Sequence, residues 1–575
     1  MCCNNKTVEV IDSSSRYSHL YRKQNKSLND ILVNQHINNN NQNESSSKRK
    51  LSQKAEEATE KQNYSEAIAI YKEIISVYPN DENFYFKLGK IYLQLKLFSE
   101  ALDIFTKAIE INKTNPSLYL NKGICEFNLR KYSESIETFN KGSYLDIKNI
   151  DLYLNKGAAL NHLKRFDEAI ECLTTGLLIK KDDSSIYNNI GVSYFRKGDF
   201  EKSIEYYDKA MKYSPEDPLP LNNKGASLKK LKKYNEALEC FDKAIELNPD
   251  DYMSYYNRAN TYKLLKKYDK ALDEFDHAIK LNKKYISSYF NKGLILNTLG
   301  RYNEAIDNFN KCLKLNKKYS KAYLNKGISL DNLNRIEEAM EQYDKALTLN
   351  PKYSEAILNK GISLFNLEKY DKAIKYYDKV IKIDKKASSA YSNKGVSLFK
   401  LKRYDEAIEN FNQALNIDPN YLDVYINKGI CYKEQNKINE AIQEFDKALE
   451  IKDDFSLAYF NKGMAYNDLE GEDNHRKAVD LLDMAIKYKN DYYDAYFNKG
   501  CILIDLGEYK EAMKMFNECK KLKNDNNNDD NENEEEKEYD KYIKQCVVLI
   551  NNGENNKKSE EEDDEGNESE NNEDC

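Results

Sequence analysis

A repeat of 34 residues dominates this chain. One small residue recurs at that spacing at twelve successive positions: Gly89, Gly123, Gly157, Gly191, Gly225, Ala259, Gly293, Gly327, Gly361, Gly395, Gly429 and Gly463. A second small residue follows twelve positions later and an aromatic residue or leucine four positions after that, as Ala407 and Phe411 follow Gly395. A period of this length corresponds to one supersecondary unit, so the chain is expected to be a stack of similar units.

Residues 388–421 show what one unit contains. The first half places apolar and small residues four, three and three apart, which is one face of a helix: Tyr391, Gly395, Leu398 and Leu401. Lys402-Arg403 form a turn, and a second helical face follows with Tyr404, Ala407, Ile408, Phe411, Ala414 and Leu415. Pro419 ends that helix because proline lacks the amide hydrogen and clashes with the preceding turn. Each unit is therefore predicted to be two short amphipathic helices that need a neighbour to bury their apolar faces.

This pattern resembles the tetratricopeptide repeat. The matching residues of the unit are Tyr391, Gly395, Leu398, Tyr404, Ala407, Phe411, Ala414 and Pro419. Two positions depart from the family: tyrosine stands where the family usually has tryptophan, and Lys394 replaces the leucine before the glycine. The resemblance implies an all-α fold, a right-handed superhelical solenoid of about fourteen helix-turn-helix units. It also implies that the first helices of successive units line the concave surface.

Composition shifts predict four segments. Residues 1–47 are rich in asparagine and serine and are expected to be disordered, and the solenoid is expected over 48–526. One unit carries a three-residue insertion near 470–474, in the turn between its helices, where a soft joint is expected. Residues 527–550 are predicted to form an acidic linker and a capping helix, and 551–575 an acidic, disordered tail.

Composition also narrows the classes of function. Charged residues make up 32% of the chain with both signs interspersed, and the net charge is −7, so nucleic acid is not expected as the ligand. The chain has no run of 18 apolar residues and no secretory signal, so no transmembrane segment is expected. The cysteines fall at core positions without a CxxC spacing, which predicts reduced thiols in a cytoplasmic or nuclear protein.

No catalytic site is predicted. The repeats, linker and capping helix account for residues 48–550, and no phosphate-binding glycine loop or nucleophile arrangement stands out. The histidines are few and scattered, so neither a metal site nor a cofactor is expected.

The candidate binding residues are asparagines two positions before the small residue of each first helix. We call them the asparagine ladder: Asn121, Asn155, Asn189, Asn223, Asn257, Asn291, Asn325, Asn359, Asn393, Asn427, Asn461 and Asn498. An amide offers both a donor pair and an acceptor, so the ladder could hold the backbone of an extended peptide. A similar ladder lines the repeat arm of the O-linked N-acetylglucosamine transferase. The alternative is that these amides bond locally or to water.

Other side chains of the first helices are weaker candidates. Aromatic residues beside the ladder suit a protein ligand, although packing within the array explains any single one equally well: Phe127, Phe195, Phe365 and Phe399. Arg196, Lys229, Lys230 and Lys263 make the middle of the array basic, and Asp331, Glu434, Asp468 and Asp505 make the later part acidic. Most charges of this kind belong to solvated faces.

The sequence therefore predicts a non-catalytic scaffold whose partners are other proteins or peptides. The alternatives are a structural or self-associating subunit of a large assembly, of the cell-cycle or ciliary type, and a targeting subunit for an enzyme acting in trans. Cys2 and Cys3 are candidate acylation sites that would give weak lipid anchoring, and Ser559 precedes three glutamates and is a candidate phosphorylation site.

Overall fold

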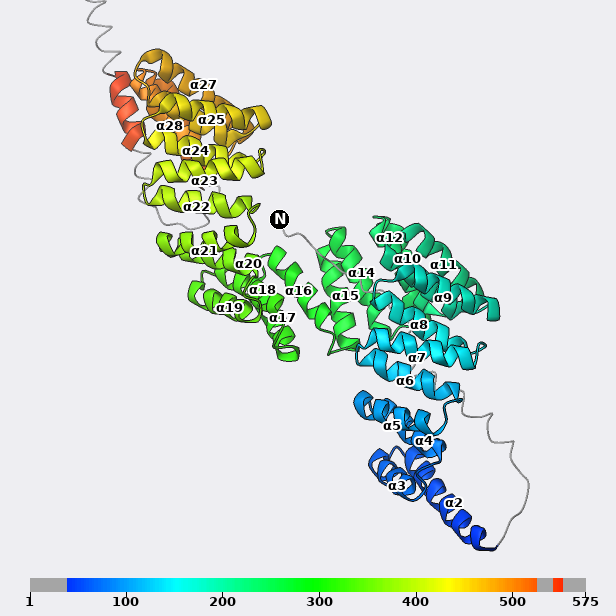
Figure 1. Ribbon diagram of the computed structural model, residues 1–575. Coiled ribbons are helices and arrows are strands. Elements are labelled where there is room, and N and C mark those ends of the chain that lie inside the picture. The colour runs from blue at the N-terminus through cyan, green and yellow to red at the C-terminus, as the bar shows by residue number, and fades with distance from the viewer. Residues whose placement is uncertain (1–38, 525–540, 552–575) are drawn as a thin grey trace, which may run out of the picture. The chain divides into compact units, whose positions relative to one another are not determined.

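The computed structural model describes residues 39–524 and 541–551, and those residues contain helices and no strand. Within the described residues the helices α2 to α29 form fourteen consecutive pairs, and Figure 1 labels most of them. The first helices of the pairs are α2 (Asn39–Glu60), α4 (Glu82–Gln94), α6 (Pro116–Asn128), α8 (Ile150–His162), α10 (Ser184–Lys197), α12 (Pro218–Lys230), α14 (Tyr252–Leu264), α16 (Ile286–Thr298), α18 (Ser320–Asn332), α20 (Ser354–Asn366), α22 (Ser388–Lys400), α24 (Leu422–Glu434), α26 (Ser456–Asn467) and α28 (Tyr493–Asp505).

The second helices carry the odd labels: α3 (Tyr64–Val77), α5 (Phe98–Ile111), α7 (Tyr132–Leu145), α9 (Phe166–Ile179), α11 (Phe200–Tyr213), α13 (Tyr234–Leu247), α15 (Tyr268–Leu281), α17 (Tyr302–Leu315), α19 (Ile336–Leu349), α21 (Tyr370–Ile383), α23 (Tyr404–Ile417), α25 (Ile438–Ile451), α27 (Glu472–Tyr488) and α29 (Tyr509–Asn524). A further helix covers residues 541–551. The predicted all-α repeat array is confirmed. The first helix α2 begins at Asn39, ahead of the start expected near residue 48.

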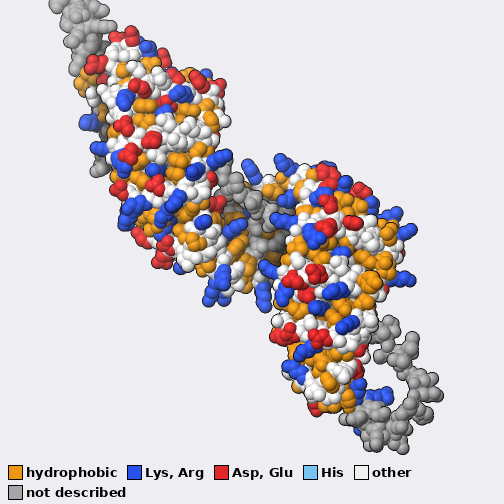
Figure 2. Space-filling model, viewed as in Figure 1, with side chains coloured by type: hydrophobic (Ala, Val, Ile, Leu, Met, Phe, Trp, Pro, Cys, Tyr) orange, Lys and Arg blue, Asp and Glu red, His pale blue; other side chains and the backbone are white. Residues whose placement is uncertain are grey.

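The chain divides into two compact units, Met1–Leu299 and Gly300–Cys575. Within each unit a second helix packs against the first helix of its own pair and against the first helix of the next pair, as α11 packs against α10 and α12. Neighbouring first helices also touch one another, as α10 touches α12 and α12 touches α14. On the face seen in Figure 2, both units mix basic and acidic side chains with apolar ones.

The repeated small residue lets the two helices of a pair meet. Ala407 and Phe411 are fully buried, and the glycine at 395 faces the ring of Phe411. The turn between the helices uses a residue with positive φ, such as Lys402 with φ 58°. Glycine takes this place in three turns, Gly198, Gly300 and Gly507, while lysine, arginine, asparagine, glutamine or glutamate takes it in the others.

The tyrosine that stands where the family usually has tryptophan forms a hydrogen bond through its hydroxyl. The hydroxyl of Tyr119 donates a 3.0 Å hydrogen bond to the carbonyl of Lys113, six residues earlier in the loop that joins two pairs. Tyr153, Tyr187, Tyr289 and Tyr425 make the same bond in their own pairs. A ring that is buried or half-buried, with a hydroxyl that reaches the loop backbone, therefore closes the connection between pairs.

The inserted residues near 470–474 lengthen a helix instead of a loop. Gly471 has φ 108°, and α27 begins directly after it and runs for 17 residues, three more than α25. Arg476 bonds Glu472 of the added turn at 2.8 Å and Glu508 of the next pair at 3.0 Å. Through these ionic contacts between exposed side chains Arg476 links the added turn to the next pair, and the soft joint expected there stays a prediction.

The helix at 541–551 covers the last pair. Cys546 is fully buried, and the ring of Tyr542 stacks on Phe516 of α29 with centroids 5.2 Å apart. Tyr542 also meets Phe497 of α28 edge-on. The end of the array is thus closed by apolar contacts, while Val547 and Val548 stay exposed.

Candidate partner-binding surface

The asparagine ladder lies on the face that the first helices form. Asn223 in α12 bonds Asn188 in α10, and Asn257 in α14 bonds Asn222 in α12, with no second helix intervening. We call this surface the first-helix face. Each compact unit carries its own part of it.

Most ladder amides bond the backbone of their own helix. In eight of them Nδ2 donates to the carbonyl oxygen four residues earlier, at 2.7–3.0 Å: Asn121, Asn155, Asn189, Asn291, Asn325, Asn359, Asn461 and Asn498. This is the local bonding that the alternative interpretation expected. It uses one amide hydrogen and holds the side chain in the same orientation in these eight pairs. An amide also has a second hydrogen and an oxygen acceptor.

Burial of the ladder differs between the two compact units. Asn121, Asn155, Asn189, Asn223 and Asn257 of the first unit are buried, whereas Asn291 at its end and the ladder asparagines from Asn325 onward are half-buried. Asn223 and Asn257 bond across to the neighbouring first helix, and the other buried ladder residues bond their own helix. The second unit therefore presents the more accessible part of the ladder.

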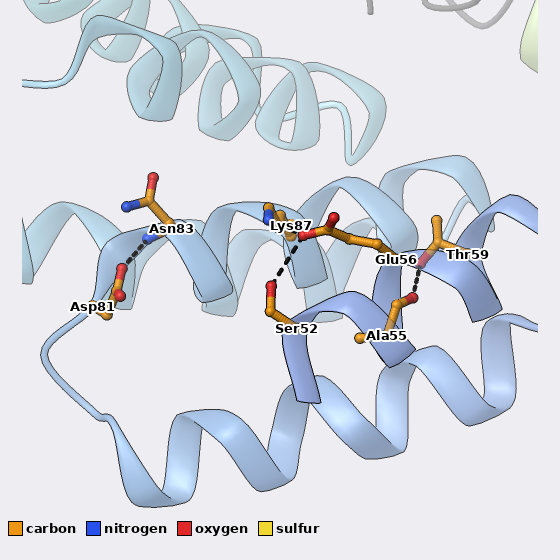
Figure 3. Close-up of polar contacts among 7 residues, drawn as sticks. All are labelled: Ser52, Ala55, Glu56, Thr59, Asp81, Asn83 and Lys87. Atoms are coloured by element: carbon orange, nitrogen blue, oxygen red, sulfur yellow. Dashed lines mark hydrogen bonds and ion pairs between the residues drawn. The ribbon is translucent and has the colours of Figure 1, made fainter. Parts of the chain in front are cut away.

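The ladder is interrupted at the N-terminal end by an ionic contact. Lys87 stands at the ladder position of α4, and its Nζ lies 2.5 Å from Glu56 Oε1 of α2 (Figure 3). Ser52 donates to the same oxygen at 3.0 Å. The lysine lowers the pKa of Glu56 against the opposing effect of burial. An ion pair thus connects the first helices α2 and α4, whereas hydrogen bonds between asparagines connect α10 with α12 and α12 with α14.

The four candidate aromatics pack mainly inside their own pairs. Each meets the aromatic residue that begins the second helix, with ring centroids 5.2–5.7 Å apart: Phe127 with Tyr132, Phe195 with Phe200, Phe365 with Tyr370, and Phe399 with Tyr404. Phe195 is only 7% exposed. Phe127 also contacts His162 of the next pair edge-on. Packing against these neighbours explains why aromatic residues occupy the four positions.

Several of the charged candidate residues form hydrogen bonds or ion pairs with other residues of the chain. Lys229 donates to Asn257 Oδ1 at 3.3 Å and Lys263 to Asn291 Oδ1 at 3.1 Å. Asp331 accepts hydrogen bonds from the hydroxyls of Tyr343 and Ser363, and burial raises the pKa of its carboxyl despite those bonds. Asp468 lies 2.9 Å from Lys433. Basic and amide groups therefore share the first-helix face of the first unit.

Lys394, the other departure from the family, forms an ion pair between pairs of helices. Its Nζ lies 2.7 Å from Asp378 Oδ1, 16 residues earlier in the preceding second helix. Six further pairs repeat this contact: Lys224–Asp208, Arg258–Asp242, Lys292–Asp276, Lys360–Asp344, Lys462–Asp446 and Lys499–Asp483. Where Asn310 or Asn412 replaces the acid, the matching lysine forms no such pair within the described part of the chain. A basic residue 16 positions after an acidic residue is visible in the sequence, but an interpretation based on apolar residues alone does not find these ion pairs.

Three predicted modification sites lie outside the described residues: Cys2, Cys3 and Ser559. Among the described residues no group of three or more histidine, cysteine or acidic side chains could hold a metal ion. None of the described helices has the length and apolar character needed to cross a membrane. The described cysteines are free, and all but Cys501 are buried.

Family models of the tetratricopeptide repeat match along the chain, over residues 150–183, 184–217, 218–251, 240–273, 286–319, 386–454 and 493–526. A model described as anaphase-promoting complex, cyclosome, subunit 3 matches residues 60–142 and 332–414. The chain belongs to the tetratricopeptide repeat family.

Several solved structures are similar in part. The Cut9–Hcn1 hetero-tetramer of the anaphase-promoting complex is 16% identical over 87% of this chain and 96% of that chain, with a TM-score of 0.43. Yeast Tom70 is 19% identical over 76% and 96%, with a TM-score of 0.35. MamA protein is 27% identical over 29% and 92%, with a TM-score of 0.27. No curated protein sequence matches this chain.

Proposed function

We propose that this protein is a non-catalytic scaffold that binds extended segments of partner proteins along its first-helix face. One observation supports the proposal: the same amide, with the same local bond, recurs in eight of the first helices. Asn359, Asn461 and Asn498 each donate to the carbonyl four residues earlier at 2.7–2.8 Å, and all three side chains are half-buried.

The chemistry of the amide explains what such a series could bind. Besides the hydrogen used in the local bond, an amide side chain has a second hydrogen and an oxygen that can bond a ligand. A peptide backbone offers one donor and one acceptor per residue, so a row of amides can hold an extended chain without reading its side chains. Because each hydrogen bond is worth only about 0.5–1.5 kcal/mol net, affinity would come from several asparagines acting together.

A quadruple variant in the second unit tests this proposal. Linear peptides would be selected from a random library against the full chain, and their affinities measured for the wild type and for N325A/N359A/N393A/N427A. Losing four such bonds should weaken binding by about 2–6 kcal/mol. Backbone N-methylation of the same peptides should weaken binding to the wild type, because it removes the donors that the asparagine oxygens accept.

The quadruple variant should stay folded, since alanine has the higher helix propensity. Thermal unfolding serves as the control, and a matched variant replaces four exposed lysines of second helices, K345A/K372A/K379A/K447A, which lie away from the first-helix face. Unchanged peptide affinity in the asparagine variant, with unchanged unfolding, would remove the ladder from the binding surface.

A second candidate function is a structural subunit of a large assembly. The match of residues 60–142 and 332–414 to the family model of an anaphase-promoting complex subunit favours it. In that case, substitutions at exposed apolar residues outside the first-helix face, such as Tyr144 and Leu178, should impair association more than the asparagine variant does.

A further inference from the structure

One hollow of the surface is lined by the helices α5, α6 and α7, and its volume is about 230 Å³. Three lysines line it, each from a different segment: Lys113 from the loop before α6, Lys122 from α6 and Lys141 from α7. Among the described residues that line it there is no ladder asparagine, so this site is separate from the ladder. We call it the lysine hollow.

Thr106 explains why Lys122 is available in the hollow. In seven other pairs the basic residue at this position of the first helix forms an ion pair with an aspartate 16 residues earlier. For Lys122 that place holds Thr106, whose hydroxyl donates to the carbonyl of Leu102 at 2.8 Å. The lysine has only a long contact to an acid, 3.9 Å to Glu126 Oε1 within its own helix. Lys122 therefore lacks the close aspartate that its counterparts have.

Thr138 explains why there is space beside this lysine. In the pair of α20 and α21 the same place holds Tyr376, whose ring centre lies 5.3 Å from Nζ of Lys360. Threonine is smaller than tyrosine by a whole ring, and the hydroxyl of Thr138 donates to Glu126 Oε2 at 2.6 Å. The volume that a ring fills in the later pair is left open at α6 and α7.

The charges that line the hollow favour an anion. Lys113 and Lys141 are exposed, and neither ammonium group forms an ion pair with a described residue. Glu110, also exposed, is the one acidic side chain among the described lining residues, so three ammonium groups surround the hollow with one carboxylate. Each ammonium is a compact charge with three hydrogens to donate.

A phosphate monoester fits these features. It carries about 1.5 to 2 negative charges at pH 7 and three acceptor oxygens, whereas a carboxylate has one charge and two oxygens. A cavity of about 150 Å³ holds a molecule of the size of benzene. The larger hollow therefore has room for a phosphate and for the side chain that carries it. Ile109 and Tyr119 supply an apolar wall for that side chain.

We propose that the lysine hollow binds a phosphorylated side chain of a partner protein. Membrane surfaces attract clusters of about four to eight basic residues. Here the equivalent basic residue is neutralised by aspartate in seven other pairs, so the chain presents a single phosphate site at this place in the repeat. The site goes beyond the proposed binding of extended segments to the first-helix face, because second helices supply most of its lining residues.

The test uses the full chain and the peptides Gly-Gly-pSer-Gly-Gly and Gly-Gly-pTyr-Gly-Gly, with binding followed by phosphorus NMR. T106D restores the aspartate of the other pairs, which should pair with Lys122 and repel the phosphate. It should weaken the tighter of the two phosphopeptides about tenfold or more. Because aspartate stands at this position in seven other pairs, the variant should keep the melting temperature of the wild type.

The matched control is T174D. Thr174 stands at the same place in α9 and donates to the carbonyl four residues earlier at 2.7 Å, as Thr106 does. Ile190 stands where a lysine would face it, so the new carboxylate has no basic partner of this kind. T174D adds the same charge to the chain and should leave the affinity for the phosphopeptide unchanged.

A second variant removes two of the ammonium groups. K113M/K141M changes only exposed side chains, so it should stay folded, and it should weaken the phosphopeptide about tenfold or more. Peptides with serine, tyrosine or glutamate in place of the phosphorylated residue should bind at least about tenfold more weakly, measured by displacement. Added salt should weaken the phosphopeptide.

Three results would overturn the proposal. The first is that neither phosphopeptide binds, or that T106D and K113M/K141M bind it as tightly as the wild type does. The second is that inorganic phosphate binds as tightly as both phosphopeptides, which would indicate a small phosphate compound as the ligand. The third is that vesicles containing a phosphatidylinositol phosphate bind more tightly than the peptides and lose binding in T106D, which would indicate a membrane.

The lysine hollow and the ladder are tested independently. The quadruple variant N325A/N359A/N393A/N427A lies in the second compact unit and should leave phosphopeptide binding unchanged. T106D should in turn leave the affinity for the peptides selected against the ladder unchanged. Failure of one proposal therefore leaves the other standing.

Discussion

A side-chain Cβ placed on Gly395 would lie 2.5 Å from Cε1 of the Phe411 ring, closer than atoms of this kind approach. The ring is fully buried, so it has no solvent into which to move. G395A should therefore destabilise the array by about 1–3 kcal/mol through overpacking, and G395V by more. Urea unfolding followed by circular dichroism measures this.

The control for the Gly395 variants is K400A, at an exposed position of the same helix, which should change stability by less than about 0.5 kcal/mol. A G395A protein as stable as the wild type would mean that α22 and α23 shift apart at little cost. Ala259, the natural alanine of the series, shows that some shift can be accommodated when a whole pair is built around it.

The ion pair of Lys394 with Asp378 should contribute little by itself. The lysine side chain is 23% exposed and the aspartate 50%, so water screens much of the attraction. A double-mutant cycle of K394M and D378N should give a coupling energy of about 0.2–1 kcal/mol that falls with added salt. A cycle of K326M and N310A, where the acid is missing, should give no coupling. Equal coupling at both places would contradict the assignment.

Glu126 should make stability depend on pH. Its side chain is buried, accepts a 2.6 Å hydrogen bond from Thr138, and has a pKa raised chiefly by burial. The folded protein then holds this proton more tightly than the unfolded chain, so stability falls as pH rises above the ordinary glutamate pKa of about 4.3. E126Q, which keeps the acceptor, should raise Tm more at pH 7 than at pH 4.

Differential scanning calorimetry of E126Q and wild type across that pH range measures the effect. The matched control is E137Q, at an exposed position of the second helix of the same pair. An advantage of E126Q that is the same at pH 4 and pH 7 would show that burial does not disfavour the charged form of Glu126.

The last helix should protect the end of the array. Y542A removes a ring stacked on Phe516 and should loosen α28 and α29 by about 1–3 kcal/mol. Because each pair of a solenoid contacts only its neighbours, hydrogen exchange should speed up in these two helices and stay unchanged in α18 to α22. V548A, at a 55% exposed position, is the control and should leave exchange unchanged. Faster exchange throughout the second unit would contradict a local capping role.

Much of the fold could be read from the spacing of residues along the chain. The alternation of Gly395, Ala407 and Phe411 predicted two helices and their contact, because helical periodicity and small residues are local properties of the sequence. The replacement of tryptophan by tyrosine was visible too, but the bond from Tyr119 to the Lys113 carbonyl was not, since it depends on how the loop folds back.

The sequence predicted where the candidate surface lies, but not which hydrogen bonds its asparagines form. The regular asparagines placed the ladder on the first helices, whereas the direction of each amide depends on whether a carbonyl of its own helix or an amide of the next helix is closer. Asn121 bonds its own helix and Asn223 bonds Asn188, although both occupy the same place in the repeat. Phe127 and Phe195 were candidates because of their positions in the repeat, and their rings pack against the second helix of their own pair.

The sequence by itself therefore determined the period, the helix pairs and the family, because these follow from residues close together in the chain. The division into two compact units at Leu299 and Gly300 came only from the packing of whole helices. Gly198 and Gly507 occupy the same turn as Gly300 without such a boundary, so no local signal marks it. The hollow lined by Lys113, Lys122 and Lys141 likewise appeared only in three dimensions, since it depends on which side chains from different helices meet.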